Sequence, residues 1–115
     1  MPIESYVLWE KVGKIALKLP EVYEKLCYDT PAFYTGKNFF VRLKEDGETI
    51  VVYNPERDNW IATNPDVFYF TDHYKNYPTL LLVDLKGVTT KELSQLIITS
   101  WKARATKKLL LAYVS

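Results

Sequence analysis

The sequence predicts an α+β fold, a two-layer sandwich in which one antiparallel sheet is covered on one face by helices. Apolar residues recur at three- and four-residue steps near both ends of the chain, which is typical of amphipathic helices. Between them lie short segments rich in aromatic and β-branched residues, separated by glycine-containing turns, which is typical of strands. A length of 115 residues with 48% hydrophobic residues suits one core. We therefore expect a single domain over residues 1–115.

The first expected element is a helix that starts close to Pro2 or Ser5 and ends before Pro20. Its inward stripe would consist of Leu8, Val12, Ile15, Ala16 and Leu19. Another stripe, formed by Lys11, Lys14 and Lys18, would face water. The helix would therefore lay its apolar side on the sheet and keep a basic side exposed.

Three short strands should follow, near residues 32–35, 39–43 and 49–53. Gly36 and the pair Asp46-Gly47 lie between them, and glycine tolerates the positive φ that tight turns need. These strands would form an antiparallel meander.

A short helix over residues 56–62 is expected next, with Asn54 as its cap and Pro55 at its first position. Trp60 and Ile61 are its expected core residues. Two more strands should cover residues 67–70 and 79–85, joined by a polar loop over residues 72–78.

A long helix should close the fold. Thr89 and Glu92 have the spacing of a capping box. The inward stripe of this helix would consist of Leu93, Leu96, Ile97, Ser100 and Trp101. A basic cluster and a short apolar tail, residues 109–111, come after it.

Composition limits the possible functions. The formal net charge is +1, so the whole protein carries no field that would predict a polyanion partner, and any basic patch must be local. Cys27 is the single cysteine, which excludes an internal disulfide and suits a reducing cytoplasm. The longest apolar run, residues 80–83, is too short to span a bilayer. No cluster has the spacing of a metal site, a catalytic triad or a phosphate loop, so we expect no catalytic residues and no cofactor. The single cysteine and the short apolar runs predict a cytoplasmic protein without a membrane partner.

A set of short motifs, in order along the chain, resembles the MmcQ/YjbR-like family over nearly the whole length. These motifs are Leu19-Pro20, Thr30-Pro31-Ala32-Phe33, Gly36-Lys37, Phe40-Val41-Arg42-Leu43, Pro65 with Val67-Phe68, His73-Tyr74, Tyr77-Pro78 and Trp101. The resemblance implies a CyaY-like, or double-wing, α+β topology, which agrees with the expected element order. It also implies double-stranded DNA as a partner, because members are customarily labelled DNA-binding for that architecture.

If DNA is the ligand, lysine and arginine side chains must reach its phosphates. The candidates are Lys37, Arg42, Lys44, Lys75, Lys102, Arg104, Lys107 and Lys108. Ordinary solubilising charge is the competing interpretation, and the C-terminal group could also stabilise a helix end.

The loop that carries His73, Tyr74 and Tyr77 supports an alternative function. Its side chains could form the rim of a pocket for a small molecule or a protein, with the sheet as floor. They could equally pack over the edge of the sheet with no ligand.

Overall fold

The computed structural model describes residues 3–114 and confirms the predicted α+β class. The helices are α1 (Ile3–Ala16), α2 (Arg57–Thr63), η1 (Asp72–Tyr74, a single 3-10 turn), α3 (Thr90–Arg104) and α4 (Lys107–Val114). The strands are β1 (Val22–Cys27), β2 (Thr30–Thr35), β3 (Asn38–Leu43), β4 (Thr49–Tyr53), β5 (Phe68–Tyr69) and β6 (Leu80–Asp84).

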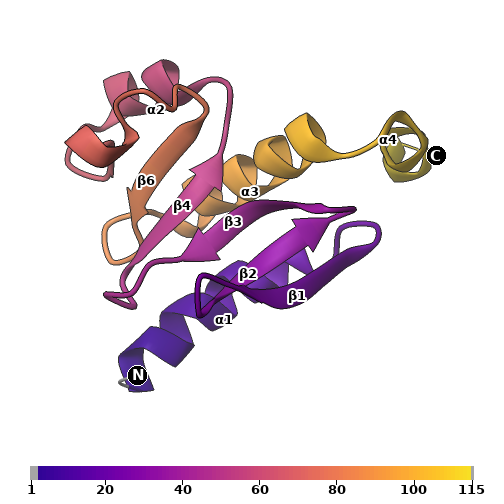
Figure 1. The fold of residues 1–115 in the computed structure, drawn as a ribbon, viewed down its shortest axis with the longest axis horizontal. Helices are drawn as coiled ribbons and strands as arrows, with labels where there is room; N and C mark the ends of the chain where they lie inside the picture. The colour runs from indigo at the N-terminus through magenta and orange to yellow at the C-terminus, as the bar shows by residue number, and fades with distance from the viewer. Residues whose placement is uncertain (1–2, 115) are drawn as a thin grey trace.

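The strands form one antiparallel sheet in the order β1-β2-β3-β4-β6-β5. Helices α1 and α3 lie together behind one face of it (Figure 1). Successive strand residues point to opposite faces. In β4, Ile50 and Val52 join the main core under these helices, whereas Val51 belongs to a smaller cluster with Tyr74 and Leu82 on the opposite face.

The first helix packs much as expected. Val12, Ala16 and Leu19 are buried, although the helix itself ends at Ala16. Pro2 lies outside the described residues. Trp9 adds a core contact that the stripe did not include, because its ring stacks on Phe33 with centroids 4.8 Å apart.

The local structure differs from the prediction in two places. Strand β1 was not predicted, because an edge strand with charged residues at its centre lacks a strand-like alternation. Asn54 does not cap α2: the residue before the helix is Glu56, and no side chain caps it. Asn54 is instead buried, accepting from the Glu56 N–H at 2.9 Å and donating to Thr99 at 3.1 Å.

The predicted turns and the last capping box are confirmed. Gly36 and Gly47 have φ values of 61° and 73°. The Glu92 N–H donates to Thr89 Oγ1 at 3.1 Å, while the Thr89 N–H donates to Glu92 Oε1 at 3.0 Å. The apolar tail is part of a separate short helix, α4, which projects from the body (Figure 1).

Candidate functional site

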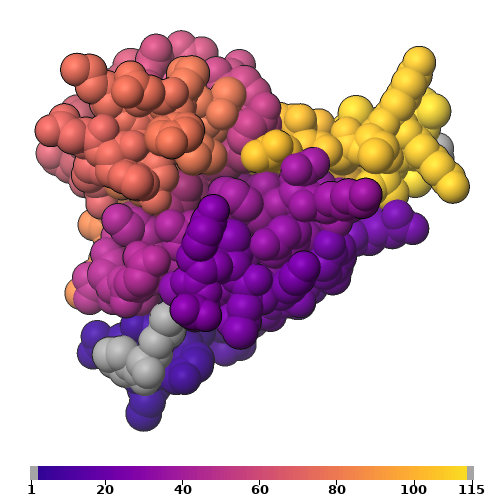
Figure 2. Space-filling view, in the orientation of Figure 1, coloured from indigo at the N-terminus to yellow at the C-terminus, as the bar shows by residue number. Residues whose placement is uncertain are grey.

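A hollow of about 520 Å³ lies on the sheet face opposite α1 and α3, where the η1 loop stands over the strands. In Figure 2 this loop belongs to the salmon and orange part of the surface, which abuts the purple and magenta strands. The residues lining the hollow are Tyr28, Phe39, Arg42, Glu45, Val51, His73, Tyr74, Tyr77 and Leu80. We call it the Arg42 hollow. The three loop residues of the alternative prediction are therefore brought together in one concave site.

Arg42, a predicted DNA-phosphate contact, is buried, with 8% of its surface exposed, so it does not belong to an exposed basic patch. It alternates in β3 with Val41 and Leu43, which face the main core, so it points to the hollow. Its Nη1 donates to Thr30 Oγ1 at 3.3 Å and to the Leu43 carbonyl at 3.4 Å.

Tyr74 closes over Arg42 from the loop. The Arg42 Nη2 donates to the Tyr74 hydroxyl at 3.3 Å, and Tyr74 itself is only 7% exposed. All these bonds of Arg42 are near the long limit for hydrogen bonds. The guanidinium thus has a defined position, but each of its hydrogen bonds is long and therefore weak.

Arg57, at the start of α2, holds the loop in place, a role that no local sequence pattern indicates. Its Nη1 donates to the Tyr74 carbonyl at 3.1 Å and to the Tyr77 carbonyl at 3.0 Å. The ring of Phe70 covers its guanidinium, with the centroid 4.0 Å from Cζ. Because these contacts hold the loop backbone, the hollow is formed without any ligand.

Tyr28 stands at the mouth of the hollow in an unusual backbone conformation. It forms the β1–β2 turn with Asp29, and both residues have positive φ, 52° and 66°. Hairpin turns of this kind favour Asn and Gly, and an aromatic residue in this region of φ is uncommon. The turn holds the Tyr28 ring 5.5 Å from the Arg42 Cζ.

Glu45 is the local counter-charge to Arg42. Its Oε1 lies 3.5 Å from Arg42 Nη1, but 64% of its side chain is exposed. A hydrogen bond from its own backbone N–H, together with the positive charge of Arg42, lowers the pKa of Glu45. Lys44 adds a second cation, with its Nζ 5.9 Å from the centroid of the Tyr74 ring.

The C-terminal basic residues occupy a different part of the molecule. Lys102, Lys107 and Lys108 are exposed on α3 and α4, whereas Arg104 is half-buried with its Cζ 3.7 Å from the Tyr53 ring centroid. Residues 93–115 contain four basic residues and no Asp or Glu, whereas the preceding residues carry eleven basic and fourteen acidic ones. We call Lys102, Lys107 and Lys108, with Arg104 beside them, the C-terminal basic surface. It lies where the yellow end of the chain projects in Figure 2.

The remaining predicted lysines do not share one location. Lys37 is exposed in the β2–β3 turn, which lies toward the α4 end of the molecule (Figure 1). Lys44 begins the β3–β4 turn, which lies at the opposite end in this view. That second turn is acidic, since Glu45, Asp46 and Glu48 follow Lys44. Lys75 is exposed just after η1.

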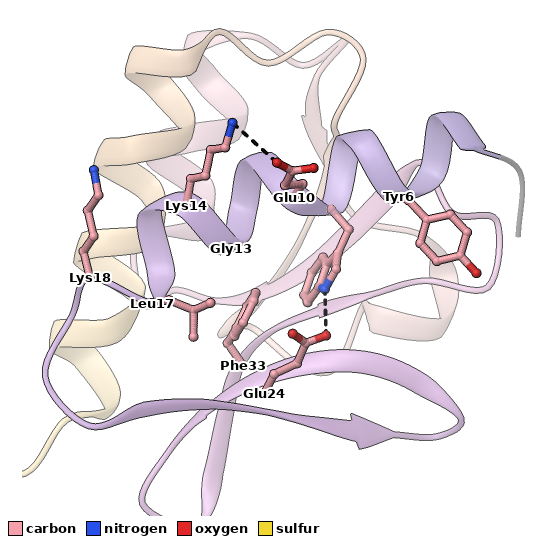
Figure 3. Close-up of a pocket in the computed structure, with 9 residues that line it drawn as sticks. Tyr6, Glu10, Gly13, Lys14, Leu17, Lys18, Glu24 and Phe33 are labelled. Atoms are coloured by element: carbon pink, nitrogen blue, oxygen red, sulfur yellow. Dashed lines mark hydrogen bonds and ion pairs between the residues drawn. The ribbon is translucent and has the colours of Figure 1, made fainter.

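A second hollow, of about 640 Å³, runs between α1 and the edge strand β1 (Figure 3). Trp9 and Phe33 line it with their rings stacked. The Trp9 Nε1 donates to Glu24 Oε2 at 3.2 Å, and Lys14 Nζ lies 3.5 Å from Glu10 Oε1. Two of the polar contacts along this groove are thus made within the chain, and Tyr6 and Lys18 also line it.

Two kinds of feature are missing from the part of the chain that the structure describes. Among residues 3–114, no three His, Cys, Asp or Glu side chains gather to hold a metal ion. Within the same range, no helix has the length and hydropathy to cross a bilayer.

Comparison with known proteins places the chain in a family. The family model described as YjbR matches residues 17–103. Two mycobacterial proteins, Uncharacterized protein Mb2600 of Mycobacterium bovis and Uncharacterized protein Rv2570 of Mycobacterium tuberculosis, are each 34% identical over 55 residues. That match spans 48% of this chain and 42% of either relative, so the chain covers less than half the length of these proteins. No solved structure matches the chain. Since the family model covers most of the sequence, the chain belongs to the YjbR family.

Proposed function

We propose that this protein is a non-enzymatic module that binds double-stranded DNA through the C-terminal basic surface. The supporting observation is the separation of charge along the chain: residues 93–115 carry four basic residues and no acidic one. The three lysines of the surface are all exposed on α3 and α4. A cytoplasmic location, expected from the single Cys27, is part of the same proposal.

The electrostatics favour this surface over the rest of the molecule. Exposed lysines can reach phosphates and release the counterions that DNA condenses, even when a protein is nearly neutral overall. The β3–β4 turn would instead bring three carboxylates toward the DNA. We therefore leave out the buried Arg42, and Lys44 beside these carboxylates, as phosphate contacts. Lys75 is also left out because η1 lies far from α4, whereas Lys37 is kept because its turn lies toward α4 (Figure 1).

The family match covers only part of the C-terminal basic surface. It ends at residue 103, so Lys102 lies inside it and Lys107 and Lys108 lie beyond it. DNA binding by this surface is accordingly proposed for this chain and not for the family.

The test is fluorescence anisotropy of a labelled short duplex, titrated with the protein at about 50 mM and about 200 mM salt. Three phosphate contacts predict a loss of affinity of about 40-fold between the two conditions, since the logarithmic slope is about −0.9 per contact. Neutralising two contacts in the variant Lys107→Gln/Lys108→Gln should reduce that slope by about two.

A matched control removes the same charge elsewhere. The variant Lys44→Gln/Lys75→Gln loses two lysines outside the C-terminal basic surface and should bind with nearly the wild-type slope. Absence of binding at the lower salt, or equal effects of the two double variants, would overturn the proposal.

A further inference from the structure

We propose that the Arg42 hollow is a binding site for a small planar aromatic ring that carries one anionic group, with Arg42 holding the anion and Tyr28 covering the ring. This site is separate from the C-terminal basic surface, and the inference stands whether or not the protein binds DNA. It rests on the burial of Arg42, the weakness of its present bonds, the rigidity of the loop and the strained position of Tyr28.

Arg42 supplies the anion-binding group. A guanidinium is a planar fork of donors that matches a carboxylate or a phosphate with two parallel bonds. In this structure its acidic partner is Glu45, 3.5 Å away and largely exposed, and its other acceptors lie at 3.3–3.4 Å. An anion of a ligand would make shorter bonds in place of Glu45, whose side chain is free to turn into water.

Aromatic rings supply the rest of the recognition. Tyr28, Phe39, Tyr74 and Tyr77 line the hollow, with the apolar side chains of Val51 and Leu80 also in its lining. Tyr28 and Tyr77 are 79% and 53% exposed, which leaves ring faces uncovered for a ligand ring. Offset or edge contacts between rings favour a planar aromatic ligand over an aliphatic one.

The backbone around the hollow indicates that the site is prepared in advance. Arg57 fixes the carbonyls of Tyr74 and Tyr77, so little loop entropy would be lost on binding. Tyr28 occupies a left-handed conformation that Asn or Gly would adopt with less strain. Residues held in such conformations are concentrated at ligand-binding sites.

Glu45 makes the inference sharply testable, because it acts as an internal competitor for Arg42. Replacing its carboxylate with an amide should strengthen binding of an anionic ligand. A site that exists only to bury Arg42 would show no such gain.

The experiment follows backbone amide shifts by NMR while the full chain is titrated with cinnamate, with phenyl phosphate and with the neutral isostere cinnamamide. At least one of the two acids should bind about tenfold more tightly than cinnamamide, because only an anion gains the charge-assisted bonds of Arg42. The stronger of the two acids identifies the anionic group as carboxylate or phosphate. Acetate alone should bind more weakly than either acid because it lacks the ring.

Four variants complete the test. Arg42→Gln should remove the preference for the acids. Tyr28→Asn should weaken the preferred acid several-fold while the protein folds at least as well as the wild type, so lost binding cannot be attributed to misfolding. Glu45→Gln should tighten binding, and the matched control Glu48→Gln, which changes a carboxylate paired with Lys86 outside the hollow, should not.

Any one of three results would overturn the inference. One is no saturable shift with either acid up to about 10 mM, a concentration that even a weak specific site for a ligand of this size would reach. A second is equal affinity for the acids and for cinnamamide. A third is an affinity for the acids that neither Tyr28→Asn nor Glu45→Gln changes.

Discussion

The Arg42 hollow and the C-terminal basic surface use the same kind of charge in opposite surroundings. Arg42 is 8% exposed and held by fixed partners, whereas Lys102, Lys107 and Lys108 are exposed, with Lys102 Nζ 5.3 Å from the centroid of the Tyr113 ring. A buried cation acts at short range through geometry and is little affected by salt. Exposed lysines attract anions at longer range and with little geometric selection, and salt strongly weakens that attraction. The two cationic groups should therefore respond differently to salt, and we propose a different ligand for each.

The largest expected effect concerns the support of the hollow. Arg57→Met should lower the free energy of unfolding by about 3 kcal/mol, because the carbonyls of Tyr74 and Tyr77 lose their buried donor. Urea denaturation measures this loss, and hydrogen exchange should show faster exchange in the η1 loop. A loss below about 0.5 kcal/mol would mean that the loop is not held by Arg57.

A smaller effect is expected at the bond between the loop and the sheet. Tyr74→Phe should cost about 1 kcal/mol of unfolding free energy, since Arg42 Nη2 loses its hydroxyl acceptor while the ring stays in place. Tyr77→Phe is the control, because this side chain is half exposed and its hydroxyl makes no hydrogen bond within residues 3–114. Equal losses in the two variants would show that the bond of Tyr74 to Arg42 contributes nothing specific.

The acidic turn next to Lys44 should stabilise the fold in a pH-dependent way. Burial alone would raise the pKa of Asp46, but hydrogen bonds from the Glu48 and Thr49 N–H groups at 2.9 Å and from the Thr49 hydroxyl at 2.7 Å outweigh it and lower that pKa. The folded pKa thus lies below the unfolded one. The stabilisation should be complete above the unfolded value near 3.9 and disappear as the pH falls through the folded value.

Asp46→Ala tests this directly. It should cost about 1 kcal/mol at neutral pH, a moderate figure because the carboxylate is partly exposed to water. Denaturation of wild type and variant over a range of pH should show the two curves converging in acid. A difference that stays constant down to the acid limit would contradict the lowered pKa.

The smallest effect on stability is expected at the C-terminal basic surface. Lys107→Ala and Lys108→Ala should each change the free energy of unfolding by no more than about 0.5 kcal/mol, because both side chains are exposed and make no ion pair in the described part of the chain. A loss of unfolding free energy comparable to that of Tyr74→Phe, measured in the same urea series, would show that these lysines stabilise the fold.

Local signals in the sequence were enough for most of the fold. Gly36 and Gly47 indicated the hairpin turns, and the Thr89–Glu92 pair indicated the start of α3. These predictions succeeded because each depends only on residues close in sequence. Strand β1 was missed because an exposed edge strand has no buried face to impose an alternation. Asn54 was misassigned because its partners on α3 are more than forty residues away.

The candidate site could be predicted only in part, for the same reason. The loop with His73, Tyr74 and Tyr77 stood out by composition. The contact between Arg42 and Tyr74 could not be predicted, because the two residues are 32 positions apart in the sequence. The one local hint was its alternation with Val41 and Leu43, which places it on the face opposite the core. Arg57 carried no sequence signal, since its role lies entirely in tertiary contacts with the loop backbone.

The most direct test of two independent cationic sites is to measure, on the same protein, the affinities for a short duplex and for the preferred aromatic acid at about 50 mM and about 200 mM salt. The duplex should lose about 40-fold in affinity, whereas the acid should change by no more than about threefold, because a buried pair is poorly screened. Saturating acid should leave duplex binding unchanged. Displacement of the duplex by the acid, or parallel loss of both affinities with salt, would contradict the account and indicate a single electrostatic surface.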